Sequence, residues 1–207
     1  MASAFRKAGQ VCTSIQKLFI QRGVYPEVVA QLKDRLVPLK VGDPTDPDTF
    51  IGPLIDLDAA KRVDEWIQEA VDGGASIVTG GERQGSLLTP TVLADVPTDC
   101  RLFREEVFGP VVCVMPFDSL EEAIDGANDS PYGLTAGIFT RNIDEGLSAA
   151  RRLRVGSLHI NETSSARVDQ MPSGGVKASG TGREGPRYAI EEMTEERLIT
   201  ISPSRLA

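Results

Sequence analysis

The sequence predicts an open, mainly parallel α/β sheet flanked by helices. Segments with the apolar spacing of helices alternate along the chain with short apolar or β-branched runs, which is the pattern of α/β proteins. One of these runs, Gly109–Phe117, is apolar almost throughout, as expected of a strand covered on both faces. The 207 residues show no internal repeat, and 41% of them are hydrophobic, so we expect one domain with a substantial core.

The first half of the chain predicts two strands and two helices. Residues 15–21, IQKLFIQ, are rich in apolar residues and predict a strand. Residues 26–39 start with proline at a first-turn position and repeat their apolar residues at helical spacing, which predicts a helix. A second helix is expected in residues 57–74, where one apolar face ends at a Gly-Gly pair, and the β-branched run 75–81 follows it as a short strand.

The second half continues the alternation after the apolar strand. Ser119 precedes a helical segment and Glu122 follows three residues later, as in a capping box. The elements expected after that helix are a strand at 133–140, a helix at 143–153, a strand at 156–161, a long loop at 162–182, a short acidic helix and a last strand at 196–202.

Composition and charge exclude several classes of function. The formal net charge is −8 and no basic block occurs, so nucleic acid is not an expected partner. No run approaches the roughly 20 apolar residues that cross a bilayer, and the first residues lack the apolar core of a secretory signal. The three cysteines have no CxxC spacing, so we expect no metal site and a cytoplasmic protein.

The stretch GQVCTS contains the first candidate for chemistry, Cys12. A cysteine attacks as its thiolate, and cations such as the nearby Arg6 and Lys7 favour that form. Free cysteines are also among the most buried residue types, so a packed and inert Cys12 is the alternative. A cysteine hydrolase needs a base, and the only histidine, His159, lies in an apolar strand-like run that favours a structural role.

The long loop requires an explanation, because structureless connections beyond about 12–15 residues are uncommon inside compact domains and are usually functional or mobile. Its end carries Gly174, Gly175, Gly180 and Gly182, which permit sharp turns or a close approach of the backbone. Their spacing matches neither of the common phosphate-binding glycine motifs, so a phosphate cradle is not favoured.

Four segments in order resemble the NAD(P)-dependent aldehyde dehydrogenases across essentially the whole chain. They are FRKAGQVCTS (5–14), EEVFGPV (105–111), NDSPYGLTAGIFT (128–140) and PSGGVKASGTGREG (172–185). The resemblance implies a fold of the aldehyde dehydrogenase catalytic-domain type. It also implies oxidation of an aldehyde to a carboxylic acid through a cysteine thiohemiacetal and thioester.

The resemblance assigns roles to three residues. It implies that Cys12 is the nucleophile, that Glu106 binds the nicotinamide ribose and that Phe108 lies beside it. The cofactor implied is NAD or NADP, and no metal is implied. A solvated charge at Glu105 and a core aromatic at Phe108 remain the alternatives for this second segment.

The resemblance also implies that parts of the enzyme are absent. The family's nucleotide-binding domain, with its general-base glutamate and oxyanion asparagine, has no counterpart in this sequence. We therefore expect a fragment that is inactive alone as a dehydrogenase, with a folded thiol-reactive domain or a non-catalytic oligomerisation module as the alternatives. Ser173 and Thr181 stand where the family usually has an aromatic and a larger apolar residue, so local packing of the loop is expected to differ.

The substrate implied by the resemblance is a small hydroxy-aldehyde or an anionic aldehyde. Arg167 is the candidate for an anionic tail, and a salt bridge with Asp169 or a solvent-facing position is the alternative. We expect residues 1–195 to form the catalytic domain and residues 196–207 an oligomerisation strand and tail. The expected partners are therefore a small-molecule aldehyde and further copies of the chain.

Overall fold

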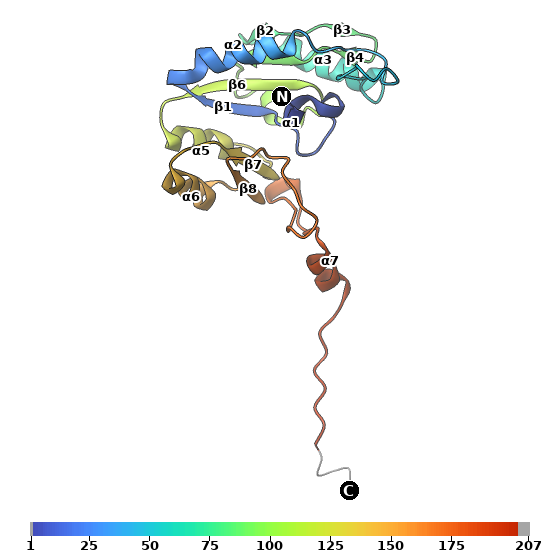
Figure 1. Ribbon diagram of the computed structural model, residues 1–207, viewed down its shortest axis with the longest axis vertical. Coiled ribbons are helices and arrows are strands. Elements are labelled where there is room, and N and C mark those ends of the chain that lie inside the picture. The colour runs from blue at the N-terminus through green and yellow to red at the C-terminus, as the bar shows by residue number, and fades with distance from the viewer. Residues whose placement is uncertain (1, 203–207) are drawn as a thin grey trace.

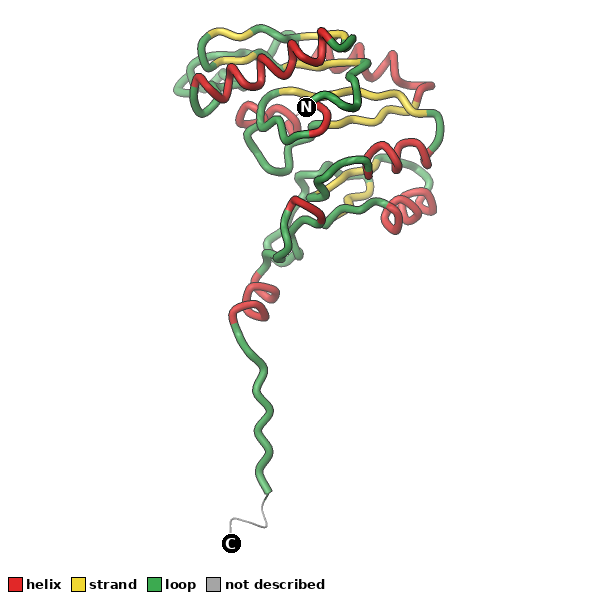
Figure 2. Tube along the Cα trace, turned by 180° about the vertical axis from the view of Figure 1, so that it is seen from behind, coloured by secondary structure: helices red, strands yellow, loops and turns green. Residues whose placement is uncertain are grey.

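The computed structural model describes residues 2–202 and arranges them in two stacked layers with a projecting tail (Figure 1). The upper layer contains the elements from α1 to β6, and the smaller lower layer contains the elements from α5 to β8. The view from behind in Figure 2 shows the same arrangement, with the C-terminal segment running away from both layers. The fold is mixed α/β, as the sequence predicts.

The upper layer is built on a four-stranded sheet with the order β1-β6-β5-β2. Its strands are β1 (Lys17–Gln21), β2 (Ser76–Thr79), β5 (Thr91–Ala94) and β6 (Val111–Phe117). β6 lies at the centre and pairs in parallel with both β1 and β5. β2 joins the edge of β5 in the antiparallel direction, so the sheet is mainly rather than wholly parallel.

Two apolar cores cover the two faces of this sheet. One core is centred on α3 (Leu57–Asp72) and α4 (Arg101–Arg104), and the other on α1 (Ala2–Phe5) and the end of α2 (Tyr25–Leu36). Buried residues of β5 and β6 alternate between them: Leu93, Val111 and Cys113 lie in the first, and Val92, Ala94, Val112 and Val114 lie in the second. This alternation explains why β6 is apolar throughout.

The lower layer consists of two parallel strands and two helices. These are α5 (Leu120–Asn128), β7 (Thr135–Ile138), α6 (Ile143–Arg152) and β8 (Ser157–Ile160). The predicted cap is present, because the Ser119 hydroxyl accepts a hydrogen bond from the Glu122 N–H over 3.2 Å. α5 joins this layer to the sheet, where Gly126 packs so closely on the Phe19 ring that a β-carbon would lie 2.7 Å from it.

The predicted helices and strands are confirmed except for the last strand, and several short elements were not predicted. The remaining short elements are η1 (Arg6–Gly9), η2 (Arg22–Val24), β3 (Arg83–Gln84), β4 (Leu87–Leu88), η3 (Lys177–Ser179) and α7 (Pro186–Met193). The β3–β4 hairpin and the central strand β5 have no counterpart in the sequence prediction. The predicted strand at 196–202 is wrong for the single chain, because these residues pair with no strand among the described residues, while 203–207 lie outside the described part.

No helix in residues 2–202 is long and apolar enough to span a membrane.

Lys17 is an unusual residue in the sheet, because it places an amine on a covered face. It pairs in register with Cys113 of β6, and its ammonium lies 3.8 Å from the centre of the Phe103 ring. Its Nζ atom is buried and makes no hydrogen bond within the described residues. Burial lowers the pKa of Lys17 from 10.5 to about 8, since removal from water disfavours the charged form.

We predict that Lys17→Met raises the free energy of unfolding near pH 7 by about 1 kcal/mol, because an uncharged chain of similar length packs on Phe103 without that desolvation cost. The folded chain loses the Lys17 proton near pH 8, while the unfolded chain keeps it to about pH 10.4. Stability of the wild type therefore rises with pH in this window, and the advantage of the variant shrinks. Urea unfolding near pH 7 and about pH 9.5 measures both effects.

The exposed Lys33 on α2 provides the control, since Lys33→Met should change stability little at either pH. A Lys17→Met gain that does not depend on pH would contradict the explanation by desolvation.

Candidate active site

Cys12 lies on an exposed turn between η1 and β1. The backbone enters this turn in the left-handed region, with φ of 52° at Lys7, 55° at Ala8 and 71° at Gly9. Such angles are costly for residues with a β-carbon and persist only where the surroundings fix them. Cys12 is not packed in a core, as one alternative held, because its thiol is exposed to solvent on this constrained turn.

Close packing and one amide fasten this turn to the body of the chain. A β-carbon on Gly9 would lie 2.0 Å from the Gly109 carbonyl oxygen, so the two backbones touch directly and only glycine fits here. The Gln10 side chain accepts a hydrogen bond from the Ile55 N–H over 2.8 Å. The turn that carries the thiol is thus held against Gly109 by close packing and against Ile55 by the hydrogen bond.

That second segment alternates between exposed and buried side chains. Glu105 and Glu106 are exposed, Val107 is 1% exposed and Phe108 is 42% exposed. The Phe108 ring is therefore not a core aromatic, and its backbone has φ of 49°, a strained value for a bulky residue. The structure thus presents a carboxylate and an aromatic ring to solvent on a segment that lies against the Cys12 turn.

The long loop 162–182 reaches the other side of the Cys12 turn. The hydroxyls of Ser164 and Ser165 donate to the Thr13 carbonyl oxygen over 3.0 and 3.2 Å. The Thr13 and Ser165 hydroxyls also lie 3.2 Å apart. Three segments that are distant in sequence therefore meet around Cys12.

Arg167 follows in the same loop and forms an ion pair. Its guanidinium lies 2.8 Å from a carboxylate oxygen of Glu184, and both side chains are largely exposed. Among the described residues Arg167 forms no ion pair with Asp169, which was one alternative, but its side chain does face solvent, as the other alternative held. Glu184 was not singled out from the sequence, because 17 positions separate it from Arg167 and no local pattern links them.

The glycines of the loop serve close backbone packing. A β-carbon on Gly156 would lie 1.7 Å from the Gly174 carbonyl oxygen, and one on Gly174 would lie 2.3 Å from that of Gly182. Ser173 forms an isolated antiparallel bridge with Glu184. These contacts account for the glycines without a phosphate ligand.

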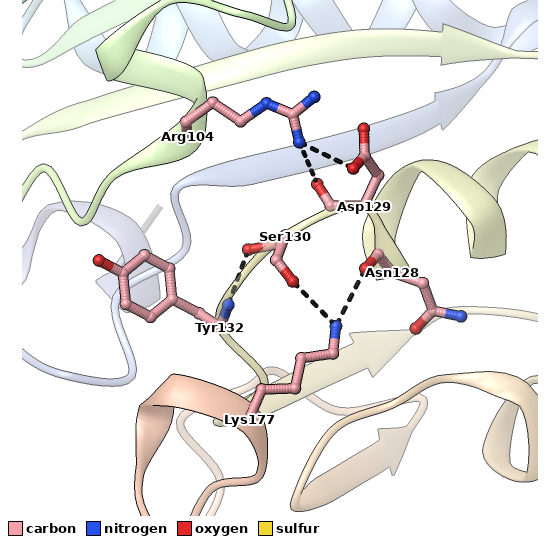
Figure 3. Close-up of polar contacts among 6 residues, drawn as sticks. All are labelled: Arg104, Asn128, Asp129, Ser130, Tyr132 and Lys177. Atoms are coloured by element: carbon pink, nitrogen blue, oxygen red, sulfur yellow. Dashed lines mark hydrogen bonds and ion pairs between the residues drawn. The ribbon is translucent and has the colours of Figure 1, made fainter.

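Lys177 fixes this loop to the lower layer, as Figure 3 shows. Its ammonium donates to the carbonyl oxygens of Asn128 and Ser130 at the C-terminal end of α5, over 2.9 and 3.1 Å. Burial lowers the pKa of Lys177. Beside it, the ion pair between Arg104 and Asp129 joins the same turn to α4 over 2.7 Å.

The other candidate groups lie away from solvent or apart from Cys12. Cys100 is buried and donates to the Pro97 carbonyl oxygen over 3.1 Å. Burial raises the pKa of Cys113 to about 12, so this thiol stays protonated. His159 lies within β8, and no hydrogen bond to Cys12 is recorded among the described residues.

Within residues 2–202, no group of three or more His, Cys, Asp or Glu side chains is placed to hold a metal ion.

Comparison with known proteins gives a consistent family signal. The family model described as the aldehyde dehydrogenase family matches residues 1–199. The 3-sulfolactaldehyde dehydrogenase of Priestia megaterium is 49% identical over 199 residues, which cover 96% of this chain and 42% of that protein. The lactaldehyde dehydrogenase of Methanococcus aeolicus is 39% identical over 202 residues, covering 98% of this chain and 43% of the relative. The chain thus spans about two fifths of the length of these relatives.

Solved structures agree with the sequence relatives. Aldehyde dehydrogenase 21 from Physcomitrella patens, in complex with the reaction product succinate, has a TM-score of 0.92 at 38% identity, covering 94% of this chain and 40% of that one. Glyceraldehyde-3-phosphate dehydrogenase from Methanocaldococcus jannaschii, complexed with NADP, has a TM-score of 0.89 at 39% identity, with 93% and 42% covered.

Proposed function

This chain belongs to the aldehyde dehydrogenase family, and from that premise we propose that it contributes Cys12 as the nucleophile to the oxidation of an aldehyde with NAD or NADP as the electron acceptor, and that these 207 residues alone are inactive as a dehydrogenase. The observation that carries the proposal is the exposed Cys12 turn packed, through Gly9 and Gly109, against the segment that exposes Glu106 and Phe108. The two buried cysteines and the absence of a disulfide among the three are consistent with a cytoplasmic location.

Cys12 supplies the covalent chemistry in this proposal. Its thiolate adds to the aldehyde carbon, a C–S bond forms and the carbonyl oxygen becomes an oxyanion. The Cys12 backbone N–H donates to no protein acceptor among the described residues, which leaves it free to stabilise that oxygen. Bound NAD or NADP supplies the acceptor for the aldehyde hydrogen and its electron pair. Cys12 is then left as a thioester, which water hydrolyses to the carboxylic acid and the free thiol.

Glu106 and Phe108 have side chains suited to binding the nicotinamide ribose of the cofactor. An exposed carboxylate can accept hydrogen bonds from two ribose hydroxyls, and an exposed ring offers an apolar surface beside them. No other side chain of the described residues forms a recorded hydrogen bond or ion pair with the Glu106 carboxylate. The residues present therefore suit a nicotinamide ribose, whose orientation would be a positioning effect on the rate.

Arg167 is the proposed contact for an anionic tail on the substrate. Its loop lies against Thr13, next to the nucleophile, through Ser164 and Ser165. Relatives include dehydrogenases of 3-sulfolactaldehyde and glyceraldehyde 3-phosphate, whose tails carry a negative charge. The proposal requires such a tail either to displace the Glu184 carboxylate from the Arg167 guanidinium or to bind the guanidinium together with that carboxylate.

The tail is the proposed site of self-association. Leu198, Ile199 and Ile201 are exposed, and their segment has no strand partner among the described residues. Such an unpaired apolar segment is suited to strand addition on a second copy of the chain. Residues 1–195 would then form the catalytic domain, and residues 196–207 would contribute to a homo-oligomer.

We predict that brief treatment with limiting iodoacetamide labels Cys12 at least about tenfold faster than Cys100 or Cys113, because only the thiolate of an accessible cysteine reacts. Intact-mass measurement with peptide mapping on the 207-residue chain gives the rates. In the longest native polypeptide that contains this chain, Cys12→Ser should lower aldehyde-dependent formation of NAD(P)H by about 10³-fold or more.

Cys100→Ala is the matched control and should retain the activity, since its thiol is buried and donates to the carbonyl oxygen of Pro97, three residues before it. Rapid labelling of Cys12 without any aldehyde oxidation would instead support a thiol-reactive domain that is not a dehydrogenase. Equal and slow labelling of all three thiols would support a non-catalytic module.

A second prediction concerns Arg167. Arg167→Met should raise the KM for 3-sulfolactaldehyde by about tenfold and leave the KM for lactaldehyde, which lacks the sulfonate, nearly unchanged. Glu184→Gln should lower the KM for the anionic aldehyde, since it frees the guanidinium. Steady-state kinetics with both aldehydes measure the change, and Arg187→Met, which removes an exposed pair with Glu191, is the control. An equal effect on both aldehydes would refute the assignment.

A third prediction tests the tail. The chain that ends at residue 195 should sediment as a monomer at concentrations where the 207-residue chain forms dimers or larger species, because it lacks the exposed strand segment. Ile199→Lys in the full-length chain should have the same effect, while Thr200→Lys, which substitutes the neighbouring polar residue, should have a smaller one. Identical sedimentation of all four chains would exclude the tail as the interface.

A further inference from the structure

Both the N–H and the carbonyl group of Val107 are hydrogen-bonded to side chains from distant parts of the chain. The Gln16 side-chain oxygen accepts a hydrogen bond from the Val107 N–H over 3.1 Å. The Arg62 guanidinium donates to the Val107 carbonyl oxygen over 2.7 Å. The Val107 side chain itself is buried in the α3 core. We call this arrangement the Val107 clamp, meaning Gln16 and Arg62 together with Val107.

Gln16 uses its other end on the same segment. Its amide nitrogen donates to the carbonyl oxygens of Leu102 and Glu105, over 3.0 and 2.7 Å. One side chain thus makes three hydrogen bonds to a segment about 90 positions away in the sequence. Because Gln16 follows Cys12 by four residues, it links the nucleophile turn directly to the turn that precedes Glu106.

Arg62 is itself held in place. Its guanidinium lies 4.6 Å from the centre of the Trp66 ring, one turn further along α3. Within the described residues its recorded hydrogen bond goes to Val107, and no carboxylate pairs with it. A stacked and oriented guanidinium loses less freedom on forming such a bond than an unsupported one.

The clamp fixes the orientation of its neighbours. Glu106 and Phe108 are bonded directly to Val107 and both are exposed, so fixing the two peptide groups of the buried Val107 fixes the backbone from which their side chains leave. Phe108 also needs support for its left-handed backbone, with φ of 49°. We propose that Gln16 and Arg62 are positioning residues that set Glu106 and Phe108 relative to Cys12. This inference rests on the proposed function, in which those two residues contact the nicotinamide nucleotide.

Two substitutions test the clamp by kinetics. In the longest native polypeptide that contains this chain, Gln16→Ala and Arg62→Met should each raise the KM for NAD(P) by roughly tenfold. The KM for the aldehyde and the iodoacetamide rate of Cys12 should stay within about twofold of the wild type, because neither residue contacts these groups. Arg62→Lys, which retains a cationic donor, should recover part of the loss. A purely structural role would change all constants together or none.

A second measurement detects the clamp independently of activity. Removing the Gln16 acceptor should speed hydrogen exchange of the Val107 amide by roughly tenfold in the 207-residue chain, as seen by NMR. Gln31→Ala is the matched control, since Gln31 bonds only to Glu27 on the exposed face of α2. Unchanged exchange in Gln16→Ala would overturn the inference, and circular dichroism melting would show whether the variant is folded.

Glu106→Ala separates this inference from the proposed function. If Glu106→Ala raises the KM for NAD(P) and the two clamp variants do not, the inference is wrong and the proposed function survives. If Glu106→Ala leaves that KM unchanged, the cofactor role of Glu106 fails, and the positioning role of the clamp fails with it. If all three raise it and exchange at Val107 quickens in Gln16→Ala, the inference is supported.

Discussion

Direct backbone contact between Gly9 and Gly109 sets the spacing on which the rest of the candidate site depends. A β-carbon at Gly9 would lie 2.0 Å from the Gly109 carbonyl oxygen, so any other residue would force the Cys12 turn away from the Glu106 segment. The left-handed angles at Lys7 and Ala8 lead the chain into that contact. In the proposed function, this local strain brings the nucleophile turn and the cofactor-binding segment together, as is common at functional sites.

The same site shows how burial separates chemically identical groups. Cys12 and Cys113 differ in environment rather than in chemistry: one stands on an exposed turn, and the other lies in the centre of the sheet with a pKa of about 12. Lysines differ in the same way, because Lys177 caps the carbonyl oxygens at the end of α5 while Lys17 meets only an aromatic ring. A reactive group in this chain is therefore identified by its surroundings, which the residue type alone does not reveal.

Local sequence patterns predicted most of the fold, whereas the resemblance to the aldehyde dehydrogenases singled out Cys12, Glu106 and Phe108. Apolar spacing and caps such as Ser119 identify long elements, because they depend on residues a few positions apart. β5 was not predicted because it has only four residues, too few to show a period, and β3 and β4 have two each. The sequence did not predict the contacts of Gln16, Arg62 and Glu184, because their partners lie 17 to 91 positions away. At that separation a single sequence carries no information about which residues pair.

The positions of these long-range contacts suggest a division of labour in the site. Segments that carry Cys12, Glu106 and Arg167 come from three separate parts of the chain, and each is exposed where it would meet a ligand. Partly buried hydrogen bonds join these segments. Gln16 links the Cys12 segment to the Glu106 segment, and Ser164 links the Arg167 segment to the Cys12 segment. Because covered hydrogen bonds are costly to leave unmade, these links resist displacement more than the exposed pair of Arg167 and Glu184 does. In the proposed function, a substrate would therefore rearrange the exposed pair while the frame around Cys12 stays fixed.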